Sequence, residues 1–458
     1  MRQSAHSSSG ARTPACSVHT PVNALVGQPI LAAAAFPGGF FHLCAARVNA
    51  LQSRANTACR NGAAIFGQSA DSRAVGIRAA IAIALVSLLM AILSQPISAQ
   101  QPLKHEGDSW VRTYAGSIPA AVRLRVNGHG PVTLTAGAGR EIGYTVKVSV
   151  MARTEAEARR MLDRESIHAE VHGEWAVLTT PGGAALSTTV IRAPRLTVAA
   201  ISTTNGAVDV RGVDGSLDVD SGAGALTCDR IRGDCKLITG GGDIHVGEVG
   251  GQLRCGTGGG HITVKSVGGR ATLQTIGGDI EALNAGGPLT AETGAGEVHI
   301  ASAKGTVDAT TGGGQIIVDK ASGIVTARNM AGPVRIGEAA GVSCESHSGG
   351  IHLTNVSGLM RVSTSVGSIF ASLMAGRLAD SFLATGNGDI TVVIPSNVGV
   401  NIRAVNNMAD NMRRIVSDFH QVQARLTGTR LIAEGAVNGG GPLLQINGTG
   451  GTIFIKRQ

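Results

Sequence analysis

The stretch that decides the fold runs from Asn205 to Gly258 and reads NGAVDVRGVDGSLDVDSG, AGALTCDRIRGDCKLITG and GGDIHVGEVGGQLRCGTG when it is divided every 18 residues. Glycine recurs at this interval, and a second glycine column follows nine residues later in each repeat. The first column, counted as position 0 of each repeat, contains Gly206, Gly224, Gly242, Gly260, Gly278, Gly296, Gly314 and Gly332. We assign these glycines to structural turns, because a long run at fixed period predicts a solenoid with one coil per repeat.

Apolar residues occupy positions 2, 4, 7, 11 and 13 of each repeat. In the repeat that starts at Gly206 they are Val208, Val210, Val213, Leu217 and Val219. Positions 2 and 4, and again 11 and 13, alternate with polar residues, which predicts two short half-buried strands per coil. Stacked coils pair each strand with its equivalent about 4.8 Å away and enclose a narrow core. We therefore predict an all-β fold, a single-chain β-solenoid of about ten 18-residue coils with β-rich capping regions.

The composition agrees with a thin core. The chain has 458 residues, of which 65 are Gly and only 8 are Phe, 2 Trp and 2 Tyr. Glycine at this density disfavours helical bundles, and its irregular local spacing excludes collagen. A core two side chains thick has little room for aromatic rings, which explains why they are scarce.

The formal charge of +8 belongs mostly to the N-terminal residues. Residues 1–99 contain seven arginines and a single acid, Asp71, which leaves 32 basic and 30 acidic residues from Gln100 onward, a net charge of +2. The body of the protein therefore lacks the basic excess of a nucleic-acid-binding protein.

A 15-residue apolar run, Ala79–Leu93, follows Arg73 and Arg78 and precedes the small residues of Ile97-Ser98-Ala99. This pattern predicts a secretory signal peptide over residues 75–99, cut after Ala99. The alternative is an uncleaved membrane anchor, although a spanning helix needs about 20 apolar residues. Residues 1–74 are predicted to be a non-structural extension or the result of a translation start placed too early.

The remaining segments are predicted to close the solenoid. We assign residues 100–204 to an N-terminal β-rich cap, 205–395 to the solenoid repeats and 396–458 to C-terminal strands and a cap. In the first cap we expect a hairpin of Ala121–Val126 and Pro131–Thr135, and a short helix over Thr154–Asp163. In the last we expect a short helix over Asn407–Phe419.

Three stretches carry a resemblance to a known family: the recurring Asn205-Gly-Ala-Val-Asp-Val motif, the turn Thr239-Gly-Gly-Gly-Asp-Ile, and the ending Val437-Asn-Gly-Gly-Gly-Pro-Leu-Leu-Gln-Ile. Over about residues 120–458 the chain resembles the bacterial "putative adhesin" β-strand-repeat family, a domain family of unknown function. The resemblance implies an exported solenoid and supplies no catalytic residues. The stretch Asn406–Ile432 departs from the family pattern.

Neither a metal site nor a catalytic site is predicted. Position 1 varies among Ala, Asp, His, Glu, Gln and Pro, so the acidic ladder of a calcium-binding β-roll is missing. His245 and His299 share a column but are three coils apart, too far to share a metal. Asp218 and Lys236 lie one coil apart and are expected to form a surface ion pair. A carbohydrate-active β-helix enzyme would need several acidic or basic groups converging in one groove.

A pair of cysteines and a column of hydroxyl residues are the remaining candidates for chemistry. Cys228 and Cys235 occupy positions 4 and 11 of one coil and should face each other across the core, so a disulfide is predicted if the protein is exported. The alternative is that the cysteines are small buried residues in place of valine. Ser221 and the threonines from Thr239 to Thr311 form a hydroxyl column at position 15, which we expect to satisfy turn backbone groups; the alternative is contact with a sugar.

These observations predict an exported, non-enzymatic scaffold or adhesin of the bacterial cell envelope, with no cofactor. Its partner is unknown, a cell-surface glycan or protein being the expected class, and the location is periplasmic, outer-surface or secreted. Two alternatives remain. One is a carbohydrate-active parallel β-helix enzyme, and the other is an envelope signalling protein anchored in the inner membrane by residues 79–93.

Overall fold

The computed structural model describes residues 99–100, 102–183, 185–374, 378–407 and 414–458. The chain divides into two units, Met1–Val86 and Ser87–Gln458, and all described residues belong to the second. The predicted extension 1–74 and the apolar segment Ala79–Leu93 lie outside the described residues. The predicted cleavage after Ala99 falls within the two-residue strand β1 (Ala99–Gln100).

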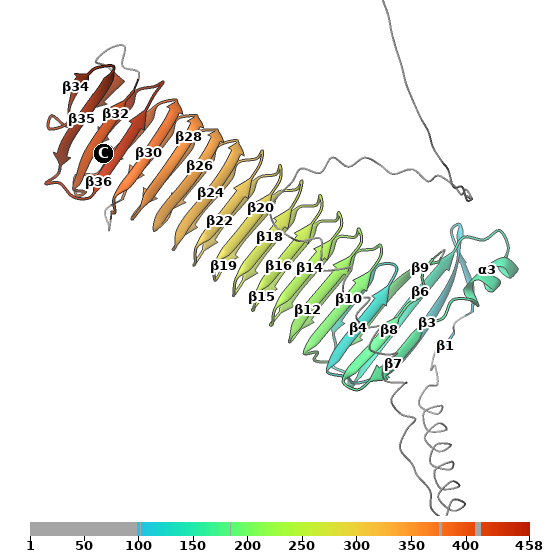
Figure 1. Ribbon diagram of the computed structural model, residues 1–458. Coiled ribbons are helices and arrows are strands. Elements are labelled where there is room, and N and C mark those ends of the chain that lie inside the picture. Colours follow the sequence, from blue (N-terminus) through green and yellow to red (C-terminus); the bar gives the residue numbers. More distant parts are fainter. Residues whose placement is uncertain (1–98, 101, 184, 375–377, 408–413) are drawn as a thin grey trace, which may run out of the picture. The chain divides into compact units, whose positions relative to one another are not determined.

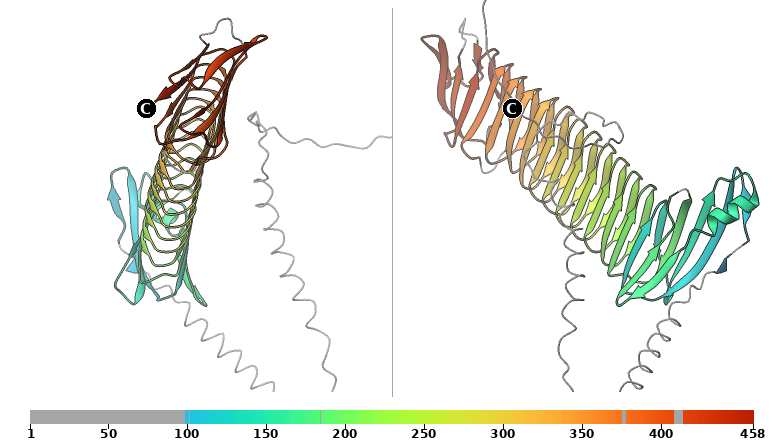
Figure 2. Two further views of the ribbon diagram at one scale, coloured as in Figure 1. Left: turned by 90° about the vertical axis from the view of Figure 1, so that its left-hand side faces the viewer. Right: turned by 45° about the vertical axis from the view of Figure 1, so that its right-hand side comes forward.

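The described part is a β-solenoid of about 11 turns with 18-residue spacing, which confirms the predicted fold class (Figure 1). Each coil contributes one strand to each of two sheets, A and B. In the regular coils every strand pairs in parallel with residues 18 positions away, as Val208 does with Leu226, and Leu226 with Ile244. The end-on view in Figure 2 shows the narrow space between the two sheets.

Sheet A contains, in spatial order from the N-terminal end of the stack, the parallel strands β9 (Leu186–Ala193), β5 (Val132–Ala136), β11 (Val208–Val213), β13 (Leu226–Ile231), β15 (Ile244–Val249), β17 (Ile262–Val267), β19 (Ile280–Ala285), β21 (Val298–Ala303), β23 (Ile316–Ala321), β25 (Val334–Glu338), β27 (Ile351–Val356), β29 (Ile369–Leu373), β31 (Ile390–Ile394), β37 (Ile453–Arg457) and β33 (Ile415–Ser417).

Sheet B contains, in the same order, β8 (Trp175–Thr179), β4 (Arg123–Gly128), β10 (Val198–Thr203), β12 (Ser216–Ser221), β14 (Cys235–Thr239), β16 (Leu253–Thr257), β18 (Ala271–Thr275), β20 (Leu289–Thr293), β22 (Val307–Thr311), β24 (Ile324–Ala331), β26 (Gly341–Ser348), β28 (Met360–Val366), β30 (Ser381–Asn387), β36 (Leu443–Gly448) and β32 (Val400–Asn406).

Antiparallel strands close both ends of the stack. At the N-terminal end β6 (Glu141–Val150) pairs with β9, β3 (Ser109–Pro119) pairs with β6, and β7 (His168–His172) pairs with β8. Strands β1 and β2 (Lys104–Glu106) pair with β3. At the C-terminal end β35 (Arg430–Val437) pairs with β32, and β34 (Gln423–Thr427) with β35. These strands cover edges that would otherwise expose unpaired backbone groups.

The coil order at both ends differs from the chain order. The coil formed by β4 and β5 lies between the later coil β8–β9 and the coil β10–β11. At the other end the last two strands of the chain, β36 and β37, lie between β30–β31 and β32–β33. Parallel coils therefore extend into both segments that we assigned to caps. At each end, one coil from another part of the chain separates the outermost parallel coil from the regular repeats.

Two local predictions are wrong. Strands β4 and β5 do not form a hairpin, because they belong to different sheets and the Asn127–Gly130 turn between them is a coil turn. The helix predicted over Asn407–Phe419 is contradicted by its described part, where Ile415–Ser417 is strand β33. The predicted helix in the first cap is present as α3 (Glu155–Leu162), with the Thr154 side chain accepting from the Glu157 amide at its N-terminus.

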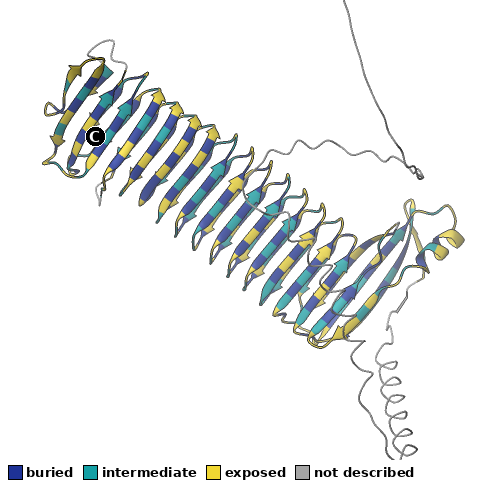
Figure 3. Cartoon of the chain, in the orientation of Figure 1, coloured by how far each residue is buried: buried dark blue, intermediate teal, exposed yellow. Residues whose placement is uncertain are grey.

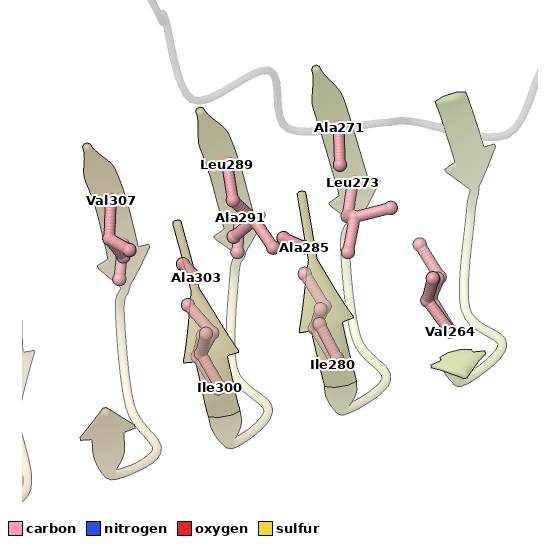
Figure 4. Packing of buried hydrophobic residues seen from close by; sticks show 14 of the residues in the cluster. Val264, Ala271, Leu273, Ile280, Ala285, Leu289, Ala291, Ile300, Ala303 and Val307 are labelled. Carbon is pink, nitrogen blue, oxygen red and sulfur yellow. The ribbon is translucent and has the colours of Figure 1, made fainter. Parts of the chain in front are cut away.

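The core is a ladder of small aliphatic residues. Positions 2, 4, 7, 11 and 13 are buried, as expected, and the residues between them alternate outward (Figure 3). Figure 4 shows Ile280 and Ile300 of sheet A opposite Leu273, Leu289 and Ala291 of sheet B. Because the outward residues of each strand contribute little to this core, they are available for contacts outside the chain.

Candidate functional site

The position-0 glycines allow successive coils to approach closely. At Gly224, Gly242 and Gly260 an added Cβ would overlap the carbonyl group of the position-0 glycine one coil earlier. The same holds for Gly278, Gly296, Gly314 and Gly332, whereas at Gly206 the overlap is with Gly130 and Pro131. These residues are structural: they fix the coil spacing and leave no side chain for binding at position 0.

The hydroxyl column at position 15 faces inward and joins adjacent turns. Thr275 Oγ1 donates to the Gly260 carbonyl at 2.9 Å and accepts from the Gly278 amide at 3.2 Å. The same two bonds recur at Ser221, Thr239, Thr257, Thr293 and Thr311. Because these hydroxyls are buried and occupied, the column serves the turns and does not face a sugar.

Cys228 and Cys235 face each other across the core, with their sulfur atoms 3.6 Å apart. The structure contains no disulfide among the described cysteines, which also include Cys255 and Cys344. The hydrogen bond with Cys228, together with burial, raises the pKa of the Cys235 thiol well above its ordinary value, and burial does the same for the pKa of Cys255. The geometry brings the predicted disulfide partners together, and the bond itself stays a prediction.

Residues named for other chemistry lie apart on the surface. Lys236 Nζ pairs with Asp218 at 3.1 Å, and His299 Nε2 lies 3.1 Å from Asp319. His245 is on strand β15, three coils from His299. Among the described residues, no three His, Cys, Asp or Glu side chains lie close enough to hold a metal ion.

The described surface contains an open groove of about 820 Å³. It follows the turn between sheets A and B over five neighbouring coils, with Thr135 and Ala136 at one end and Ser266 and Gly268 at the other. Buried Ile231 and Val249 contribute to its floor. The position-8 residues of its later coils, Gly250 and Gly268, leave that part unobstructed.

Charged side chains line the middle coils of the groove, namely Arg211, Asp214, Arg230, Arg232 and Glu248. Each charge has a partner: Arg232 pairs with Asp214 at 3.0 Å, Arg211 with Asp209 at 2.9 Å, Arg230 with Asp229 at 3.4 Å and Glu248 with Lys265 at 3.9 Å. The bond to Asp209 raises the pKa of Arg211. The ion pairs hold the guanidinium groups in place at the rim.

Arg230 has an unusual backbone. Its φ is 56°, in the left-handed region, where a non-glycine residue costs about 1–2 kcal/mol. The corresponding position 6 is Gly212 (φ 79°) one coil earlier and Asn355 (φ 54°) in a distant coil, both residue types that tolerate this conformation. An arginine in this conformation, inside the groove, is the candidate functional residue.

This groove lies away from the residues that the sequence singled out for surface chemistry. His245, His299, Asp218 and Lys236 are on the strands, whereas the groove is built by positions 5 to 8 around the turn. The signal for the groove that was available in the sequence is Arg230 at position 6, where the preceding repeat has Gly212.

In the described part of the chain, no helix is long and apolar enough to cross a membrane.

Comparisons with known proteins give matches to solved structures alone. No protein-family model matches the chain, and no curated protein does so significantly. A "putative adhesin" from Bacteroides fragilis is 14% identical, with a TM-score of 0.26, over 62% of this chain and 95% of its own. A "putative cell adhesion protein" from Clostridium sporogenes is 10% identical, with a TM-score of 0.17, over 76% of this chain and 100% of its own.

A "putative adhesin" from Parabacteroides distasonis is 11% identical, with a TM-score of 0.26, over 62% of this chain and 96% of its own. The names of these three proteins agree with the family that the sequence resembles. Their identities to this chain lie between 10% and 14%, and their TM-scores lie between 0.17 and 0.26.

Proposed function

We propose that this protein is an exported, non-enzymatic β-solenoid scaffold of the bacterial cell envelope, an adhesin that binds a cell-surface glycan or protein through the turn groove. The observation that carries the proposal is the left-handed Arg230 in the turn groove. Strained backbone of this kind clusters at functional sites, where the side chain has to be held at a particular place.

The chemistry of the groove favours binding over catalysis. The carboxylates of Asp214 and Glu248 belong to different ion pairs and lie two coils apart, about 10 Å by the strand spacing. Both side chains are solvated, and the groove is open, so a reacting group would not be shielded from water. An open row of fixed positive and negative groups suits an extended polar ligand.

The function can be tested with two matched substitutions, R230G and N355G. Both remove a left-handed non-glycine residue at position 6, so both should stabilise the fold by about 1 kcal/mol. Only Arg230 lines the groove. In a biolayer interferometry screen of glycans and matrix proteins, R230G should weaken the binding of the captured ligand about tenfold, and N355G should leave it unchanged.

The proposal fails if no member of the screen binds, or if R230G binds as tightly as the unmodified chain. If the protein depolymerises a polysaccharide in the same screen, the result favours the alternative function, a carbohydrate-active parallel β-helix enzyme, over the adhesin.

Export forms a separate part of the proposal. It is supported by the charge pattern around Ala79–Leu93. N-terminal sequencing of the protein recovered from the producing cell should give Gln100 as the first residue. Recovery in the membrane fraction with residues 79–93 retained would favour the anchored signalling protein instead.

A further inference from the structure

A row of apolar and aromatic side chains runs along the outer face of sheet A at its C-terminal end. Cross-strand register places His352 beside Phe370, Phe370 beside Thr391, Thr391 beside Phe454, and Phe454 beside Val416. We name these five residues the aromatic strip. All of them are partly or fully exposed, and Val416 retains 43% of its surface.

The rings of the strip are ordered against one another. The rings of His352 and Phe370 are stacked, with their centroids 4.5 Å apart and their planes 8° from parallel. Phe454 lies two rungs beyond Phe370, about 10 Å along the stack. The Lys456 ammonium is 5.4 Å from the centroid of the Phe454 ring. The strip therefore presents two ring surfaces with a fixed separation and a cation beside one of them.

The fold does not require rings in this column. Earlier coils carry Asp209, Thr227, His245, Thr263 and Glu281 at the same position, and they form equally regular strands. Only 3% of the chain is aromatic. Placing two phenylalanines in one outward column exposes apolar surface that gives no core packing in return.

The charge around the strip is positive. Arg335 occupies the rung before His352, and Lys456 lies beside Phe454. The neighbouring outward column contains Gly337, Thr354, Ser372, Val393 and Lys456. It ends at Asp418, whose carboxylate accepts from the Arg457 amide and makes no ion pair with Lys456 within the described residues. Within the described residues Arg335 makes no ion pair. This arrangement leaves the two cations available to an anionic ligand.

We propose that the aromatic strip binds an acidic polysaccharide. Phe370 and Phe454 stack against the apolar faces of two sugar rings, Arg335 and Lys456 pair with the carboxylates, and the Thr391 hydroxyl forms hydrogen bonds with ring hydroxyls. A chain of repeating sugars is the occupant that matches a repeating row of rings and cations. This site is on different coils from the turn groove and does not depend on it.

The experiment uses the secreted protein and isothermal titration with polygalacturonate, alginate and hyaluronan, with neutral dextran as the comparison polymer. F370A and F454A should each weaken binding of the acidic polymer about tenfold. K456A should weaken it severalfold and reduce its dependence on salt concentration. The matched control is F382A, which removes a phenylalanine that is 37% exposed on the outer face of sheet B.

Unfolding midpoints of all variants show whether they remain folded, and F382A should bind like the unmodified chain. The inference is overturned if none of the three acidic polymers binds, if dextran binds as tightly, or if a folded F370A/F454A double variant retains full affinity. R230G should leave this binding unchanged, so failure of the groove proposal and failure of this one give different results.

Discussion

Replacing Thr275 by valine should destabilise the solenoid more than its small change in shape suggests. Thr275 is 6% exposed, and its hydroxyl satisfies the Gly260 carbonyl and the Gly278 amide. Valine preserves the branched shape but leaves both backbone groups without this partner. Each buried group left unpaired costs about 1–3 kcal/mol, and the added methyl returns about 1 kcal/mol. We expect a loss of about 1–5 kcal/mol in the free energy of unfolding.

Serine at the same position separates hydrogen bonding from packing. T275S keeps the hydroxyl, as Ser221 does in an earlier coil, and loses only one methyl, which costs about 1 kcal/mol. Urea unfolding followed by far-UV circular dichroism measures both variants, with an unchanged slope indicating the same unfolding reaction. T272V, on the outward face of the same strand, should change stability by less than about 0.5 kcal/mol. If T275V is as stable as the unmodified chain, or less damaging than T275S, the hydroxyl column does not stabilise the stack.

Further predictions concern the turns and the cysteines. An added Cβ at Gly259 meets no atom within 4 Å, whereas at Gly260 it overlaps the preceding coil, so in urea unfolding G259A should be neutral and G260A should cost about 2–3 kcal/mol. A thiol count on unreduced, denatured protein should find the Cys228–Cys235 pair oxidised; four free thiols in the body would contradict the disulfide. Burial raises the pKa of Cys344 to about 12, so between pH about 8.5 and pH 12 its thiol ionises in the unfolded chain but not in the folded one. The free energy of unfolding should therefore be unaffected by this thiol below pH about 8.5 and should decrease by about 1.4 kcal/mol per pH unit above it. C344V should remove that part of the slope when stability is measured against pH.

The repeating part of the fold could be predicted from the sequence because its determinants are local. The apolar period places Val208 and Val210 inside and Asp209 outside, and parallel stacking of identical coils then fixes their neighbours. The position of the hydroxyl column follows from the same period. The start of helix α3 at Thr154 was also predictable, since a capping threonine acts only on the turn that follows it.

The ends and the site depend on pairings between distant segments. The Asn127–Gly130 tract has the composition of a hairpin turn, and only the partners of β4 and β5 show that it joins two sheets. The insertion of β36 and β37 between two coils that both precede them in the chain leaves no periodic signal. The groove depends on the backbone conformation of Arg230, which residue identity alone does not specify.

The order of the terminal coils determines how the stack can come apart. In a simple stack the last coil is also the end of the chain, so a pull on the terminus can peel coils off one after another. Here the C-terminal strand β37 is bonded on both sides, to β31 and to β33. A force applied to the C-terminus therefore has to break two ladders of backbone hydrogen bonds together before any coil is released.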